Sequence, residues 1–256
     1  MVAVMAFLAT AIATLFAQAT AVRYTKFRKP HELAWTVALA CYAIASALLA
    51  AGASTGWDSG TFRGFFVFGA VLTVPWLALG TVYLLAGPTV GRRVRFALLV
   101  FSGIGIGMLL AAPMSGPIDP TGGIPNGKDL FGAGPRALAG IGSGVGALVV
   151  FAGAVWSAVR YFRRSGEPAA SRLAITNALV AAGVLIASSG GLLQGIVGGG
   201  DVAFALTTAI AIAVIYAGFL VSTASAGASD ASARRKSLPP NERGNSVTTS
   251  TRVGSL

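Results

Sequence analysis

The stretch Ala21-Val-Arg-Tyr-Thr-Lys-Phe-Arg-Lys-Pro-His-Glu-Leu-Ala-Trp35 is the first interruption in an almost unbroken apolar chain, and it sets the orientation of everything around it. It holds four of the nineteen basic residues, at positions 23, 26, 28 and 29. Apolar runs flank it at residues 2–22 and 33–52. Each run has about the 20 residues that a helix needs to cross a hydrocarbon core about 30 Å thick. A basic loop between two such runs is typical of the cytoplasmic end of a transmembrane helix pair.

The composition agrees with a membrane protein. The 256 residues are 55% hydrophobic and 11% charged, and their mean hydropathy is +0.75. Soluble domains have about 25% charged residues, so the composition argues against a water-soluble globular fold. The net charge of +11 would suggest nucleic acid in a soluble protein. In a membrane chain it indicates cytoplasmic loops instead, and we expect no nucleic-acid partner.

The apolar runs predict seven membrane spans. Their lengths, and the absence of alternating polarity, exclude a β-barrel. Backbone groups in lipid must be hydrogen-bonded internally, so the runs are expected to be helices. The sequence therefore predicts an all-α, polytopic seven-helix bundle over residues 1–222, with spans at 2–22, 33–52, 62–86, 96–113, 136–158, 173–195 and 202–222.

The basic residues orient these spans. With the N-terminus outside, sixteen of the nineteen basic residues fall on the cytoplasmic side, and only Arg63, Lys128 and Arg136 fall opposite. This asymmetry predicts an N-out, C-in topology. A secretory signal is the alternative for the first segment, because Ala17-Gln-Ala19 resembles a cleavage site. That segment lacks a positive leading region, so we expect an uncleaved helix.

Residues 223–256 differ in character from the rest, being rich in Ser, Thr, Gly, Asn and charge. Such a composition cannot bury a core, and it predicts a disordered basic cytoplasmic tail. The basic loops and the tail are expected to attract anionic lipid.

A short repeat suggests an internal duplication. Ala21-Val-Arg-Tyr24 and Ala158-Val-Arg-Tyr161 each close an apolar run and precede a basic loop, which leads to Leu33-Ala-Trp-Thr36 or Leu173-Ala-Ile-Thr176. Spans 1 and 5 run in the same direction, so the hypothesis is a parallel 3+1+3 repeat with span 4 as the linker. Coincidence in an Ala- and Val-rich chain is the alternative.

Glycine and proline mark the helix packing. Gly140/Gly144 and Gly142/Gly146 are small-xxx-small pairs, which predict close helix contacts rather than a phosphate-binding loop. Pro75 within the third span predicts a kink, which would be either static or a hinge.

Residues for catalysis are missing from the spans. The ionisable residues that come nearest to the predicted spans lie at the edges of those spans. His31 and Glu32, for example, lie at the start of the second span. There Glu32 favours the helix dipole. A single histidine cannot give bis-His haem ligation, and Cys41 is the only cysteine. We therefore predict no catalytic residues, no cofactor, no metal site and no enzyme activity.

Neutral polar residues remain as the candidate binding site. The predicted polar pocket near the midplane consists of Tyr42, Tyr83, Asn177, Gln194 and Tyr216. These residues would either hydrogen-bond neighbouring helices or bind a ligand. The extracytoplasmic loop Pro117–Phe131 would cap a cavity, contact a partner or act as a linker.

Two strings, Arg28-Lys-Pro-His-Glu-Leu-Ala-Trp35 and Val74-Pro-Trp-Leu-Ala-Leu-Gly-Thr-Val-Tyr-Leu-Leu85, resemble a group of uncharacterised multi-spanning membrane proteins from actinobacteria. The resemblance implies a bacterial cytoplasmic membrane and supplies no activity. The 3+1+3 outline is similar to that of the SWEET and PQ-loop sugar facilitators. Because the spans lack catalytic residues, we expect a binding, sensory or accessory component with a protein partner or as a homo-oligomer. The alternatives are a facilitative carrier of a small neutral solute and, third, a membrane enzyme.

Overall fold

The structure is a computed structural model, and it describes residues 1–120, 122–162, 175, 178–187 and 200–237. These residues form helices and connecting loops, with no strand among them. The helices are α1 (Val2–Phe27), α2 (Pro30–Thr55), α3 (Ser59–Phe66), η1 (Val67–Thr73), α4 (Val74–Ala111), α5 (Gly127–Leu130), α6 (Ala133–Phe162) and α8 (Asp201–Ser237). A shorter apolar helix covers Ala178–Ala187. The predicted all-α class is confirmed.

Five helical stretches are long and apolar enough to cross a membrane: Val2–Phe27, Pro30–Thr55, Ser59–Ala111, Ala133–Arg160 and Asp201–Val221. The first two stretches coincide with predicted spans 1 and 2. Ser59–Ala111 covers predicted spans 3 and 4 together, and the last two stretches coincide with predicted spans 5 and 7. Predicted span 6, residues 173–195, lies largely outside the described residues. The described helices therefore fit a membrane protein, and the count of seven stays a prediction.

The third stretch is two antiparallel arms. Its 53 residues would extend about 80 Å as a straight helix, far more than a bilayer core. The chain reverses at Gly87, whose φ of 81° and ψ of 175° are not helical, and Pro88 follows. Across the reversal, the Trp76 Nε1 donates to the Ser102 hydroxyl at 3.2 Å. The arms 59–86 and 88–111 thus match the predicted third and fourth spans.

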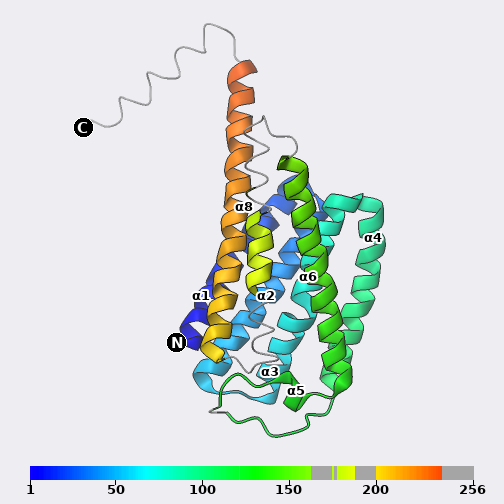
Figure 1. The fold of residues 1–256 in the computed structure, drawn as a ribbon, viewed down its shortest axis with the longest axis vertical. Coiled ribbons are helices and arrows are strands. Elements are labelled where there is room, and N and C mark those ends of the chain that lie inside the picture. Colours follow the sequence, from blue (N-terminus) through cyan, green and yellow to red (C-terminus); the bar gives the residue numbers. More distant parts are fainter. Residues whose placement is uncertain (121, 163–174, 176–177, 188–199, 238–256) are drawn as a thin grey trace, which may run out of the picture.

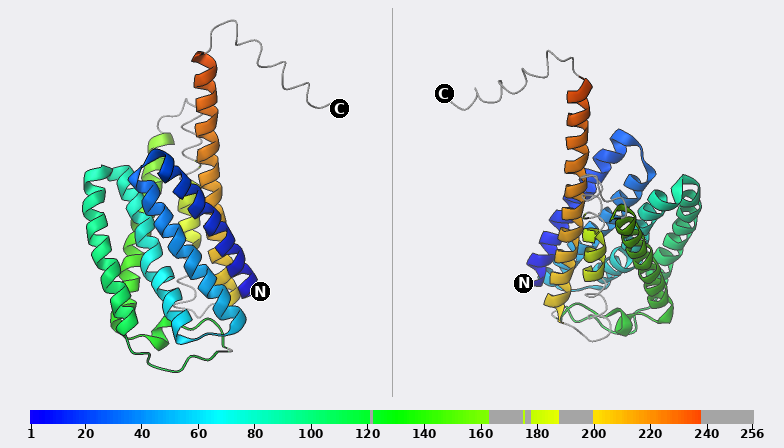
Figure 2. Two further views of the ribbon diagram at one scale, coloured as in Figure 1. Left: turned by 180° about the vertical axis from the view of Figure 1, so that it is seen from behind. Right: turned by 45° about the horizontal axis from the view of Figure 1, so that its top comes forward.

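The two ends of the bundle differ in charge. The α1–α2 connection, the Gly87 reversal and the end of α6 lie at the end from which α8 projects (Figures 1 and 2). The N-terminus, the α2–α3 connection and α5 lie toward the opposite end. Most basic residues of the described loops therefore gather at one end, as the sequence predicted.

A π-helix precedes the predicted proline kink. In η1, hydrogen bonds span five residues, so an N–H at position 75 would reach the carbonyl of Ala70. Pro75 has no N–H. The Ser143 hydroxyl of α6 donates to the Ala70 carbonyl instead, at 2.5 Å. A side chain of the neighbouring helix α6 thus bonds the carbonyl that Pro75 leaves without an N–H, and the kink itself stays a prediction.

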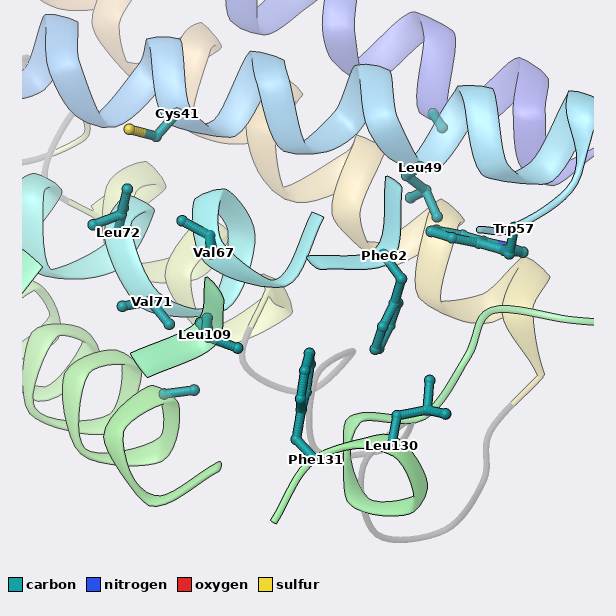
Figure 3. Close-up of a cluster of buried hydrophobic side chains, with 12 residues drawn as sticks. Cys41, Leu49, Trp57, Phe62, Val67, Val71, Leu72, Leu109, Leu130 and Phe131 are labelled. Atoms are coloured by element: carbon teal, nitrogen blue, oxygen red, sulfur yellow. The ribbon is translucent and has the colours of Figure 1, made fainter. Parts of the chain in front are cut away.

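The long loop before α6 closes the end of the bundle near α3. Leu130 and Phe131 are buried in a cluster with Trp57 and Phe62, as Figure 3 shows. The rings of Phe62 and Phe131 are stacked, with centroids 5.7 Å apart. The backbone N–H of Trp57 donates to the Pro120 carbonyl at 3.2 Å. The loop is thus packed into the fold and is more than a linker.

The last helix continues beyond the predicted end of its span. α8 extends to Ser237, so the first fifteen residues of the predicted tail are helical. Residues 238–256 lie outside the described part of the chain.

Candidate functional site

Two tyrosines of the predicted pocket lie near each other, and both are engaged. The Tyr42 hydroxyl of α2 donates to the backbone carbonyl of Thr208 in α8 at 2.8 Å. The Tyr216 ring of α8 lies 5.2 Å from the ring of Phe16 in α1. Both tyrosines pack against one apolar cluster shared by α1, α2 and α8: Ala9, Ala13, Phe16, Leu39 and Ile212.

Tyr83 lies in a different cluster of buried side chains. It is buried with Ala34, Leu79 and Leu98, and its ring covers Gly91 across the Gly87 reversal. Its hydroxyl has no hydrogen-bond partner. Asn177 and Gln194 lie outside the described residues. Among the described members of the predicted pocket, the structure thus brings Tyr42 and Tyr216 together and places Tyr83 in another cluster.

The surface carries a shallow apolar groove of about 470 Å³ between the start of α1 and the end of α2. Its one polar lining side chain, Ser54, already donates to the carbonyl of Ala50 in its own helix. Such a groove suits a lipid acyl chain better than a polar solute. Its lining residues are Ala3, Val4, Phe7, Leu8, Ala50, Ala51 and Ser54.

The most polar buried site of the described structure surrounds Glu32, in the first turn of α2. The Glu32 side chain is completely buried, and its Oε1 accepts from the Arg23 Nε of α1 at 2.8 Å. The His31 Nε2 lies 3.8 Å from the same oxygen. The second oxygen, Oε2, has no hydrogen-bond partner. The pair therefore joins α1 to α2 through one oxygen only.

Polar and aromatic groups complete this cluster. The Thr36 hydroxyl donates to the Thr20 hydroxyl at 3.0 Å, again between α2 and α1. The Arg23 guanidinium lies 5.4 Å from the centre of the Phe219 ring of α8. Arg23 therefore contacts α2 and α8 together, at the basic end of the bundle. We call Arg23, His31 and Glu32 the Glu32 cluster.

Sequence reasoning placed Glu32 correctly near a helix N-terminus but missed its burial and its partner. A carboxylate buried away from water costs several kcal/mol unless it is paired and hydrogen-bonded. Arg23 lies nine residues earlier, across the loop. The sequence signal for this pair is a base and an acid on the two sides of the short loop between the first two predicted spans.

Arg63, one of the three basic residues predicted on the opposite side, has a structural role. Its guanidinium donates to the carbonyls of Leu109 and Ala112, which end α4. A cation there complements the helix dipole. Arg63 therefore anchors α3 to the end of α4.

The described part of the chain holds no group of three or more His, Cys, Asp or Glu side chains that could hold a metal ion. Cys41 is a free, buried thiol. No family model, curated protein or solved structure matches the chain. The geometry of the bundle is therefore the basis for a functional proposal.

Proposed function

We propose that the protein crosses a bacterial cytoplasmic membrane seven times, with its N-terminus outside and its C-terminus in the cytoplasm. The reversal at Gly87 supports counting Ser59–Ala111 as two crossings. The gathering of basic loops at the end from which α8 projects supports the orientation. The sixth crossing in this proposal is the apolar run 173–195 that the sequence predicts as a span.

Within this membrane domain, the protein acts as a binding, sensory or accessory component without catalysis of its own. The observation that carries this proposal is the bond between the Tyr42 hydroxyl and the Thr208 carbonyl. A 3+1+3 carrier would place its solute between helices 1–3 and 5–7, and alternating access would require those halves to separate. Here α2 and α8 are bonded and share an apolar cluster, which favours a permanent bundle.

The cytoplasmic end is the side on which partners would bind. α8 continues for sixteen residues past Val221, about 24 Å of helix, beyond its apolar part. With Arg92, Arg93 and Arg95 beside the Gly87 reversal, this end would bind anionic lipid and a protein partner, or a second copy of the chain.

The second candidate is a facilitative carrier of a small neutral solute. The unpartnered, buried hydroxyl of Tyr83 favours it, because such a group remains available to a solute. It requires a passage beside the α4 arms.

Solute flux separates the two functions. In proteoliposomes, the accessory component gives the same osmotic shrinkage and recovery with small polyols and sugars as empty vesicles do. Flux above that background, reduced in Tyr83→Phe and unchanged in the exposed-site variant Leu148→Ala, would overturn the accessory proposal in favour of the carrier.

A further inference from the structure

Glu32 combines two properties that do not fit a purely structural ion pair. Its side chain is completely buried, and its Oε2 is unpartnered. An ionised carboxylate has two oxygens with about four acceptor positions, and arginine satisfies it best through two parallel bonds. Arg23 supplies a single Nε–H to Oε1. Half of the carboxylate is therefore left without a donor.

We propose that Oε2 of Glu32 is a proton-binding site at the cytoplasmic end of the bundle. A proton from water adds to Oε2, and the carboxylate becomes a neutral carboxylic acid. No other covalent bond changes in the protein. The empty acceptor position then becomes an O–H, and the cost of burying a charge is removed.

The Glu32 carboxylate lies between a cation and an enclosing surface. Its Oε1 is paired with the Arg23 guanidinium of α1, and its side chain is completely buried. In general, a neighbouring cation favours a charged carboxylate, whereas burial away from water favours the neutral acid. His31 is the second titratable group at the site, and α8 contributes the uncharged ring of Phe219. Arg23 and His31 are the charged or titratable side chains that contact Glu32 among the described residues.

Arg23 and His31 connect Glu32 to the surface of the protein. The side chain of Arg23 is 34% exposed and that of His31 is 15% exposed, whereas Glu32 is fully enclosed. His31 lies 3.8 Å from Glu32 and can accept a proton from water at the membrane surface. The site is thus buried but one side chain away from the cytoplasm.

Proton binding has a mechanical consequence through Arg23. The neutral acid holds the guanidinium by a weaker, singly charged hydrogen bond in place of an ion pair. Arg23 also lies over Phe219, in the helix that projects beyond the bundle. Protonation of Glu32 therefore loosens the junction of α1, α2 and α8.

Infrared difference spectroscopy of the full chain in lipid nanodiscs tests the site directly. On acidification, the wild type gains the C=O stretch of a protonated, buried carboxylic acid. The band is lost in Glu32→Gln and retained in Asp129→Asn, which removes an exposed carboxylate instead. A wild type without the band, or a band that persists in Glu32→Gln, would overturn the proposal.

A second pair of variants tests the site even if Glu32→Gln does not fold. Arg23→Gln removes the opposing charge, so the band appears at a pH higher by about one unit or more. Arg23→Lys retains the charge, and its band stays close to that of the wild type. A band that does not move in Arg23→Gln contradicts the site, whatever the function of the protein. Labels on Val22 and Ala217, exposed residues of α1 and α8, report the loosening as a distance change that Glu32→Gln abolishes.

Discussion

Ser143 and Pro75 illustrate how one side chain can compensate for a defect in another helix. Pro75 removes the donor that the π-helical pattern needs, and Ser143 donates to the Ala70 carbonyl in its place. Ser143→Ala should therefore cost about 1 kcal/mol in free energy of unfolding, because a carbonyl in lipid loses its partner. Unfolding in mixed micelles with increasing dodecyl sulfate measures this.

The test of that account is a double-mutant cycle. Pro75→Ala restores an N–H for the carbonyl, so Ser143→Ala should cost close to nothing in its presence. The control is Ser54→Ala, whose hydroxyl bonds only carbonyls of its own helix at an exposed position. Equal costs of Ser143→Ala in both backgrounds would mean that Ser143 and Pro75 act independently.

The glycines of α6 divide into two faces that the sequence did not separate. A Cβ on Gly146 would lie 3.0 Å from the backbone of Val74, and Gly142 faces Phe101 and Pro75. A Cβ on Gly140 or Gly144 would have no neighbouring atom within 4 Å. The small-xxx-small prediction is thus confirmed for Gly142/Gly146, whereas Gly140/Gly144 makes no such contact in the described structure.

Matched alanine substitutions should reveal these two faces. We expect Gly146→Ala to destabilise the bundle by about 1–3 kcal/mol, because backbone cannot move aside as a flexible side chain can. Gly144→Ala should be neutral or slightly stabilising, since alanine favours a helix by up to about 1 kcal/mol. Thermal unfolding in detergent compares the two, and equal melting temperatures would contradict the packing.

At the scale of elements, the reversal at Gly87 depends on backbone conformation and not on space. Its φ of 81° with ψ of 175° is a region open essentially to glycine, yet nothing lies within 4 Å of the site of a Cβ. Gly87→Ala should therefore cost about 1–3 kcal/mol through backbone strain alone. Gly103→Ala is the control, because it is equally uncrowded but helical. A harmless Gly87→Ala would show that the two arms do not need this turn.

The start of α3 should respond to pH. The hydroxyl of Thr61 and the backbone N–H groups of Thr61 and Gly60 donate to Asp58, and these bonds lower its pKa below the ordinary value of about 3.9. A carboxyl with a lowered folded pKa stabilises the helix above its unfolded pKa. That stabilisation is lost as pH falls through the folded value.

Amide hydrogen exchange at Gly60 and Thr61 measures this effect. Their protection should decrease on acidification in the wild type relative to Asp58→Asn at the same pH. Asparagine caps the helix without titrating, so it is the matched control. Identical protection ratios at neutral and acid pH would show that the carboxylate does not hold the cap.

At the scale of the whole molecule, apolar run lengths were enough to locate the helices, because hydrocarbon thickness dictates helix length. They could not show contacts between helices. The burial of Glu32, the engagement of Tyr42 by Thr208 and the separate position of Tyr83 depend on which faces meet. Hydropathy is nearly uniform around these helices, so it does not mark those faces.

The number of crossings between α6 and α8 decides whether the protein has seven spans. Residue 160 lies at the cytoplasmic end of α6 in the proposed orientation, and Gly200 directly precedes α8 at the other end. An odd number of crossings between them requires residues 173–195 to span the membrane. In a Cys41→Ser background, an impermeant maleimide should therefore label Gly200→Cys in intact cells and label Arg160→Cys only after permeabilisation.

Two further positions calibrate the same experiment. Asp129→Cys, within α5, should be labelled from outside, and Arg93→Cys, beside the Gly87 reversal, from inside. Labelling of positions 160 and 200 from one side would leave an even number of crossings between them and contradict seven spans. Labelling of position 93 from outside would instead mean that the whole protein has the opposite orientation in the membrane. In that case the Glu32 cluster would face the exterior, because the α1–α2 connection and the reversal within α4 lie at the same end of the bundle.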